Sequence, residues 1–133
     1  MYFDGQPGDS NIKSIWIEPS WLYEREGKYV VGSEDFPYEQ ENGQSDEEYE
    51  KYFEKICRMT NSLIGAKIFD LKINEASNEI SLFFDNHQVV RNIFDFEDKD
   101  GEGWIYRDHS KGLMVSAFID RLEKNNLNHR SFI

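Results

Sequence analysis

The spacing of apolar residues changes near residue 65, and this change limits what the chain can fold into. Between about residue 46 and that point, the apolar positions recur every three or four residues, which is typical of one face of a helix. These positions are Tyr49, Tyr52, Phe53, Ile56, Leu63 and Ile64. Ser45 and Glu48 form an S-x-x-E capping box at the start, and Gly65 suits the position after the last turn. The pattern predicts a helix over about residues 46–63.

Beyond residue 65, apolar and polar residues tend to alternate, as they do on strands with one buried face. Four such runs occur: AKIFDLKIN at 66–74, EISLFFDN at 79–86, QVVRNIFDF at 88–96 and WIYRD at 104–108. Short polar turns separate most of them, which predicts an antiparallel β-meander. Two earlier stretches, 11–19 and 21–33, also have strand character, and the second has a hairpin break at Glu26-Gly27.

Near the C-terminus, the segment KGLMVSAFIDRLEKNN returns to helical spacing, with Leu113, Ala117, Phe118 and Leu122 on one face. It predicts a second helix over about residues 112–124. The fold class expected from these elements is α+β, an antiparallel meander sheet packed against the long helix and the second helix. The length suits a single domain, residues 1–133, with a short flexible tail at about residues 1–10.

The 133 residues carry a net charge of −11, and the pI is about 4.6. Such a surface repels the phosphates of bare nucleic acid, so we expect a basic protein partner instead. The first ten residues lack the basic residue and apolar run of a signal peptide, and no segment has the roughly 20 apolar residues of a membrane span. The single cysteine, Cys57, fits a reducing compartment. These features predict a cytoplasmic protein that does not bind membranes.

Two short segments account for the net charge. Residues 34–54 hold nine acidic residues and one basic residue, for a charge of −8, and residues 95–102 hold five acidic residues and one basic residue, for −4. All other residues together carry +1. Clustered acids can be no more than a solvated face, or they can form an electrostatic docking surface for a basic partner.

The docking interpretation gives a set of candidate partner-binding residues. They are Asp95, Glu97, Asp98, Asp100, Glu102 and Trp104 in the second segment, and Glu39, Glu41 and Glu47 in the first. Carboxylates would pair with basic side chains of the partner, and Trp104 would supply a desolvated aromatic anchor.

Motifs for metal binding and catalysis are incomplete. Asp98-x-Asp100-x-Glu102-Gly103 begins like a calcium-binding EF-hand loop, but position 12 is His109, where a bidentate glutamate is needed. The three histidines are isolated, which disfavours a zinc site. Asp108-His109-Ser110 has the residue types of a catalytic triad, but consecutive residues do not normally face one another as a triad requires. We expect no cofactor, no bound metal and no enzymatic activity.

Residues 63–108 resemble a known class of proteins. LIGAKIFDLKINEASNEISLFFDNHQVVRNIFDFED, leading into GEGWIYRD, is similar to the β-meander of small bacterial immunity proteins. That group guards cells against polymorphic toxins and contact-dependent growth inhibition toxins. The resemblance covers about a third of the chain, and no fixed motif of the group maps onto numbered positions here. It implies a role rather than a set of residues, namely tight binding of a cognate toxin domain, often a basic nuclease.

The function expected is therefore that of an immunity protein that neutralises a toxin domain. It would occlude the active site or another essential surface through acidic and aromatic contacts. Four alternatives remain open. The chain could be an acidic nucleic-acid mimic or another protein-binding regulator, although its acids cluster in two places instead of following one line. It could also be a small enzyme or a calcium-binding module that uses residues 98–109.

Overall fold

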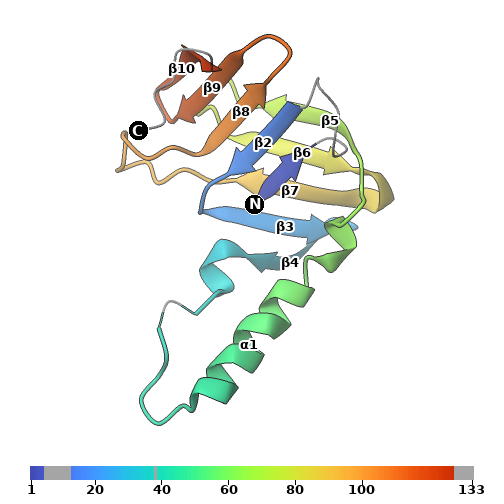
Figure 1. Ribbon diagram of the computed structural model, residues 1–133, viewed down its shortest axis with the longest axis vertical. Coiled ribbons are helices and arrows are strands. Elements are labelled where there is room, and N and C mark those ends of the chain that lie inside the picture. Colours follow the sequence, from blue (N-terminus) through green and yellow to red (C-terminus); the bar gives the residue numbers. More distant parts are fainter. Residues whose placement is uncertain (5–12, 38, 128–133) are drawn as a thin grey trace.

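The computed structural model describes residues 1–4, 13–37 and 39–127, which form two packed antiparallel sheets (Figure 1). The first sheet has the order β1-β2-β8-β9-β10, and the second has the order β4-β3-β7-β6-β5. The strands of the first sheet are β1 (Tyr2–Asp4), β2 (Lys13–Ile17), β8 (Trp104–Asp108), β9 (Leu113–Phe118) and β10 (Arg121–Asn126). Those of the second are β3 (Trp21–Arg25), β4 (Lys28–Gly32), β5 (Ile68–Ile73), β6 (Ile80–Phe84) and β7 (Gln88–Asn92).

The core lies between the two sheets and follows from the alternation of side chains along each strand. In β6 and β7 every second residue is buried, and the residues between are partly exposed. The rings of Phe3 on β1 and Phe84 on β6 join the sheets, with centroids 5.2 Å apart. The buried apolar residues include Ile15, Ile17, Trp21, Tyr23, Val31, Ile80, Leu82, Phe84, Val90, Phe94, Trp104 and Ala117.

A polar link also holds the sheets together at the turn between β5 and β6. Asn78 in this turn has a positive φ of 63°, a conformation that asparagine adopts more easily than most residues. Its side-chain amide donates to the carbonyl of Phe118 at 3.0 Å, and its own carbonyl accepts from the Trp104 indole at 2.8 Å. The turn of the second sheet is therefore bonded to two strands of the first.

The predicted α+β fold was wrong, because residues 112–124 form β9, β10 and their tight turn instead of a second helix. The register pairs Arg121 with Phe118 and continues to Asn126 opposite Leu113. Strand β9 also pairs with β8, from Leu113 to Ala117. The helical spacing from Leu113 to Leu122 was coincidental, since alternate residues of β9 point to opposite faces of the sheet. Two packed sheets therefore take the place of one sheet covered by helices.

The helix α1 spans Asp46–Arg58, so its start was predicted correctly but its end was placed too late. The side chain of Ser45 accepts the Glu48 N–H at 3.1 Å, which confirms it as the N-cap. The chain then passes through a short 3-10 helix, η2 (Asn61–Leu63), and reaches Gly65 at a positive φ of 78°.

Helix α1 does not cover either sheet, contrary to the prediction. It extends away from the sheets beyond β4 (Figure 1), and Ile56 is its one buried residue. The inner face of each sheet is already covered by the other sheet. At the end of the helical segment, Ser62 donates to Gln88 Oε1 at 2.7 Å and lies 2.7 Å from the Tyr23 hydroxyl. Since Tyr23 and Gln88 are buried, this network fixes η2 to the second sheet.

Part of the predicted N-terminal tail is also a strand, because residues 2–4 form β1 and pair with β2. The rest of the predicted tail, residues 5–10, lies outside the described residues. None of the helices described here has the length and apolar character needed to span a membrane.

Candidate functional site

The first acidic segment, residues 34–54, lies within a projection that we call the acidic arm, residues 33–58. It comprises the short 3-10 helix η1 (Ser33–Asp35), the following loop and α1. Figure 1 shows the arm reaching away from the sheets beyond β4. Phe36 attaches it, because its ring contacts Trp21 of β3 and Phe53 of α1, with centroids 6.1 and 5.2 Å apart. The Tyr49 hydroxyl adds a hydrogen bond to the carbonyl of Pro37 at 3.2 Å.

The acidic arm presents carboxylates and aromatic rings to solvent together. The three candidate residues Glu39, Glu41 and Glu47 are all exposed. Glu47 pairs with Lys51 at 2.9 Å, an exposed i,i+4 pair of the kind that adds little to stability. On the same helix Tyr52 is 46% exposed and Phe53 is 40% exposed.

The two acids at the base of the arm have structural roles instead. The Ser20 hydroxyl donates to Glu34 at 2.6 Å, and the Gly32 N–H donates to Asp35 at 2.7 Å. Tyr29 also donates to Asp35. This hydrogen bond is the main reason that the pKa of Tyr29 rises to about 12 and the pKa of the Asp35 carboxyl falls. The carboxylates available to a partner are therefore those further along the arm.

The second acidic segment forms the loop between β7 and β8, residues 93–103, which we call the acidic loop. Its five candidate acids are exposed: Asp95, Glu97, Asp98, Asp100 and Glu102. Two of them shape the loop, because Asp95 accepts the Glu97 N–H at 2.9 Å and Asp98 accepts the Asp100 N–H at 3.1 Å. Such Asx turns explain why aspartate rather than glutamate occupies these two positions.

Buried aromatic residues hold both ends of the acidic loop. Phe94 is 6% exposed at the start, and Trp104 is 4% exposed at the end. Between them Gly103 packs so closely that a Cβ added there would lie 2.4 Å from the Phe94 ring. Trp104 therefore belongs to the core and not to the acidic surface where the docking interpretation placed it. Phe96, which is 70% exposed, is the aromatic residue that the loop presents to solvent.

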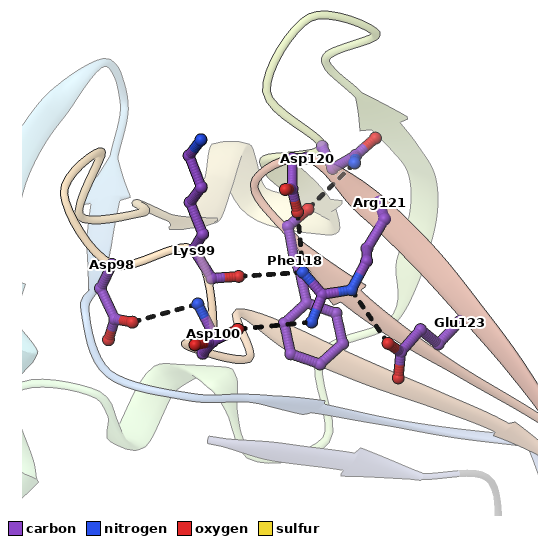
Figure 2. Close-up of polar contacts among 8 residues, drawn as sticks. Asp98, Lys99, Asp100, Phe118, Asp120, Arg121 and Glu123 are labelled. Atoms are coloured by element: carbon purple, nitrogen blue, oxygen red, sulfur yellow. Dashed lines mark hydrogen bonds and ion pairs between the residues drawn. The ribbon is translucent and has the colours of Figure 1, made fainter.

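Arg121, at the start of β10, connects the acidic loop to the β9–β10 hairpin (Figure 2). Its guanidinium lies over the Phe118 ring, 4.1 Å from the centroid, and donates to the carbonyl of Lys99 at 3.1 Å. It is 3.7 Å from the Asp100 carboxylate. It also pairs with Asp120 and Glu123, each at 2.9 Å. The hydrogen bond to Glu123 is the main reason that the pKa of Arg121 lies above its ordinary value, and Asp120 adds to this effect.

The acidic surface is therefore larger than the sequence indicated. Asp120 and Glu123 join the five acids of the loop, and with Lys99 and Arg121 the whole surface carries −5. Because residues 112–124 were predicted to form a helix, the sequence did not place Asp120 and Glu123 beside the acidic loop. Met114, Ser116 and Phe118 are all buried on β9, but the polar Ser116 interrupts the apolar alternation, so the sequence carried no clear signal for this strand.

The motifs for catalysis and metal binding have structural roles. Asp108 is buried at the β8–β9 turn, where it accepts from the Ser110 hydroxyl at 2.6 Å and from the Ser110 N–H at 3.0 Å. The bond from the Ser110 hydroxyl is the largest cause of a lowered pKa of the Asp108 carboxyl, and the backbone bond adds to it. The carboxylate of Asp98, the first residue of the calcium-like sequence, accepts the Asp100 N–H within its own turn. Within the described ranges, no three His, Cys, Asp or Glu side chains are grouped so that they could hold a metal ion.

The acidic arm and the acidic loop occupy separate parts of the molecule (Figure 1). The loop lies beside β8, whereas α1 extends beyond β4. They do not form one line of charges, so this arrangement gives no support to mimicry of a nucleic-acid backbone.

Comparison with known proteins gives no relative for this chain. No protein-family model matches it, and neither a curated protein nor a solved structure is significantly similar.

Proposed function

We propose that this chain is an inhibitor of the immunity-protein kind, which binds a basic toxin domain in the cytoplasm mainly through the acidic arm. The observation that carries the proposal is the joint presence of carboxylates and exposed aromatic rings on α1. Tyr52 and Phe53 are 46% and 40% exposed, and the acidic arm to which they belong, residues 33–58, holds nine acidic and three basic residues, for a charge of −6. Aromatic residues at the centre and polar or charged residues at the rim are a common composition for a protein interface.

The helical geometry of α1 places these groups side by side. At 100° per residue, Tyr49, Tyr52, Phe53 and Ile56 share one face. Asp46 and Glu50 border that face on one edge, and Glu48 borders it on the other. A partner that buried Tyr52 would therefore bring its own basic groups next to carboxylates. This arrangement favours a basic groove over an apolar one.

Inhibition would follow from occlusion. A nuclease holds its substrate with Lys and Arg side chains that contact phosphates, and carboxylates can pair with the same side chains. A helix standing clear of the sheets can enter such a groove without a clash from the rest of the molecule. The acidic loop, with its exposed Phe96, would act at the rim and speed association.

The test begins with three forms of the chain used as baits in extracts of the cell that encodes it. Mass spectrometry identifies the proteins that each bait captures. The first is the wild type. The second, Tyr52→Ala with Glu50→Lys, changes the arm but keeps the pair between Glu47 and Lys51. The control, Tyr2→Ala with Glu75→Lys, makes the same types of change at exposed positions on β1 and just after β5.

The proposal predicts a basic protein that binds the wild type and the control but not the arm variant. Loss of an aromatic anchor costs about 2 kcal/mol, which is roughly a 30-fold rise in Kd. The captured protein, expressed alone, should stop growth, and co-expression of the wild type should restore it. Equal binding to the arm variant, or binding without neutralisation, would contradict the proposal.

A further inference from the structure

Strand β5 is an open edge with an unusually apolar surface. It ends the second sheet, and among the described residues its strand neighbour is β6 alone. All six of its residues are exposed, including Phe69 at 73%, Leu71 at 48% and Ile73 at 39%. The edge strand β10 of the other sheet, RLEKNN, has one apolar residue. Charged and polar residues of that kind normally protect an edge from pairing.

We propose that β5 pairs with β5 of a second copy of this chain, antiparallel and across a two-fold axis at Leu71. This inference does not depend on the proposed function. The two copies would join their second sheets into one continuous sheet, with the acidic arm and the acidic loop of each copy left free.

The backbone of β5 limits which registers are available. The Asn74 N–H donates to the Glu79 carbonyl at 2.8 Å, so Lys72 and Asp70, in alternation with Asn74, also turn their backbone groups toward β6. Leu71 and Ile73 therefore turn theirs toward the open edge. In agreement, the Leu71 N–H is bonded to the carboxylate of its own neighbour Asp70, at 2.9 Å.

Charge then selects one symmetric register. In an antiparallel pair, a residue whose backbone N–H and C=O point to the open edge must lie opposite another such residue. The two-fold axis must therefore pass through a residue and not between two residues. An axis at Asp70 places two aspartates opposite each other, and an axis at Lys72 places two lysines opposite each other. An axis at Leu71 places Asp70 opposite Lys72 twice, and Leu71 opposite Leu71. Opposite charges in directly facing positions stabilise a strand pair, and like charges destabilise it.

The overall charge favours this location for contact between two copies. Each copy carries −11, so close approach of the acidic segments would be repulsive. One Asp and one Lys balance within Ile68–Ile73. In Figure 1, β5 lies at the edge of the second sheet opposite β4, away from α1. The edge also borders a depression of about 820 Å³ lined by Phe69, Phe83 and Val89, which extends the apolar surface.

A charge exchange tests the pairing. Asp70→Lys gives a chain with two lysines in the contact, and Lys72→Asp gives one with two aspartates. Sedimentation across a concentration series should move the wild-type mass from 15.8 kDa toward twice that value. Each single variant should stay at the monomer mass. An equimolar mixture of the two should regain the dimer, because positions 70 and 72 of one copy then face residues of opposite charge in the other.

The matched control is Lys28→Asp, an exposed lysine on β4 at the opposite edge of the same sheet, which should dimerise like the wild type. Circular dichroism should show that all variants keep the wild-type fold. A wild type that remains monomeric, a mixture that gains no mass, or a control that fails to dimerise would each overturn the proposal.

Disulfide formation tests the register separately, in a Cys57→Ser background because Cys57 is exposed. Facing residues of a hydrogen-bonded pair have Cα atoms about 5.5 Å apart, within reach of a disulfide. Leu71→Cys should therefore give a covalent dimer on mild oxidation. Ile73→Cys should not, since the two copies of residue 73 would be roughly 13 Å apart along the strands. Equal crosslinking at both positions would exclude this register.

Discussion

The Arg121 guanidinium lies 4.1 Å from the centroid of the Phe118 ring, and these two residues face each other at the end of the β9–β10 hairpin. The ring fixes the plane of the guanidinium, which leaves its N–H groups directed at neighbouring oxygen atoms. One of these is the carbonyl of Lys99 in the acidic loop, at 3.1 Å. A single cation therefore orders a surface made from two segments that are distant in sequence.

Replacement of Arg121 by Gln should loosen the acidic loop. The variant loses the contact with Phe118 and the bond to the Lys99 carbonyl, so backbone amides of residues 95–102 should exchange with solvent faster. The unfolding midpoint should move little, because the ion pairs lie at the surface. Hydrogen exchange read by mass spectrometry measures the exchange of the loop amides, and denaturant unfolding measures the midpoint. Lys124→Gln, on the same strand, is the control, and equal loop exchange in the two variants would contradict this role.

Trp104→Phe should destabilise the fold and not merely weaken a contact at the surface. The change removes the indole donor, leaves the Asn78 carbonyl without that bond and opens space between the sheets. An unsatisfied buried acceptor costs about 1–3 kcal/mol, and this partly buried carbonyl should lie at the lower end of that range. Denaturant unfolding should show this loss. Trp16→Phe is the comparison, because Trp16 is 37% exposed, and it should cost less. Equal losses would argue against a core role for Trp104.

Most strands could be predicted from the sequence because their alternation follows directly from burial on one face. Residues 80–84 and 88–92 show it clearly, with every second side chain buried. The helix start was also predictable, since Ser45 caps it through a local bond. Both features depend on neighbours in sequence, and sequence patterns record such neighbours well.

The errors arose where contacts distant in sequence decide the structure. Leu113, Ala117 and Phe118 fit a helical face, but pairing of β9 with β8 places them on a strand. Trp104 follows an acidic segment in sequence, yet packing between two sheets buries it. Arg121 had no local signal for its role, because its partners include residues about twenty positions earlier in the chain. Local spacing cannot specify which sheet covers a given strand.

The pair formed by Tyr29 and Asp35 should make stability depend on pH at both extremes. The pKa of Asp35 is lowered by its bonds, so its stabilising contribution is present above the unfolded pKa and is lost as pH falls through the folded value. The pKa of Tyr29 is raised to about 12, so its contribution is present below the unfolded value of 10 and is lost as pH rises toward 12.

Carboxyl titration by nuclear magnetic resonance checks the acid side of this pair. Asp35 should titrate below 3.8 in the wild type and closer to 3.8 in Tyr29→Phe, because the largest cause of its shift is then absent. The Gly32 N–H remains as a donor, so part of the shift should persist. Tyr2→Phe, at another exposed tyrosine, is the control. An unchanged Asp35 titration in Tyr29→Phe would show that the hydroxyl is not bonded there in solution.

Loss of the N-cap should unfold α1 while leaving the sheets intact. Ser45→Ala removes the acceptor for the Glu48 N–H, which costs about 1 kcal/mol of helix stability. Since Ile56 is the one buried residue of the helix, α1 gains little from tertiary packing and should lose helicity measurably. Ser45→Asp keeps an acceptor and is the control.

Circular dichroism and amide exchange within α1 report the helix, and tryptophan fluorescence in denaturant reports the sheets. The helix signal should fall in Ser45→Ala while the fluorescence midpoint stays near the wild-type value. This outcome means that the acidic arm can order or disorder by itself, so a partner would have to supply part of its ordering free energy. A midpoint that falls together with the helix signal would instead show that α1 and the sheets unfold as one cooperative unit.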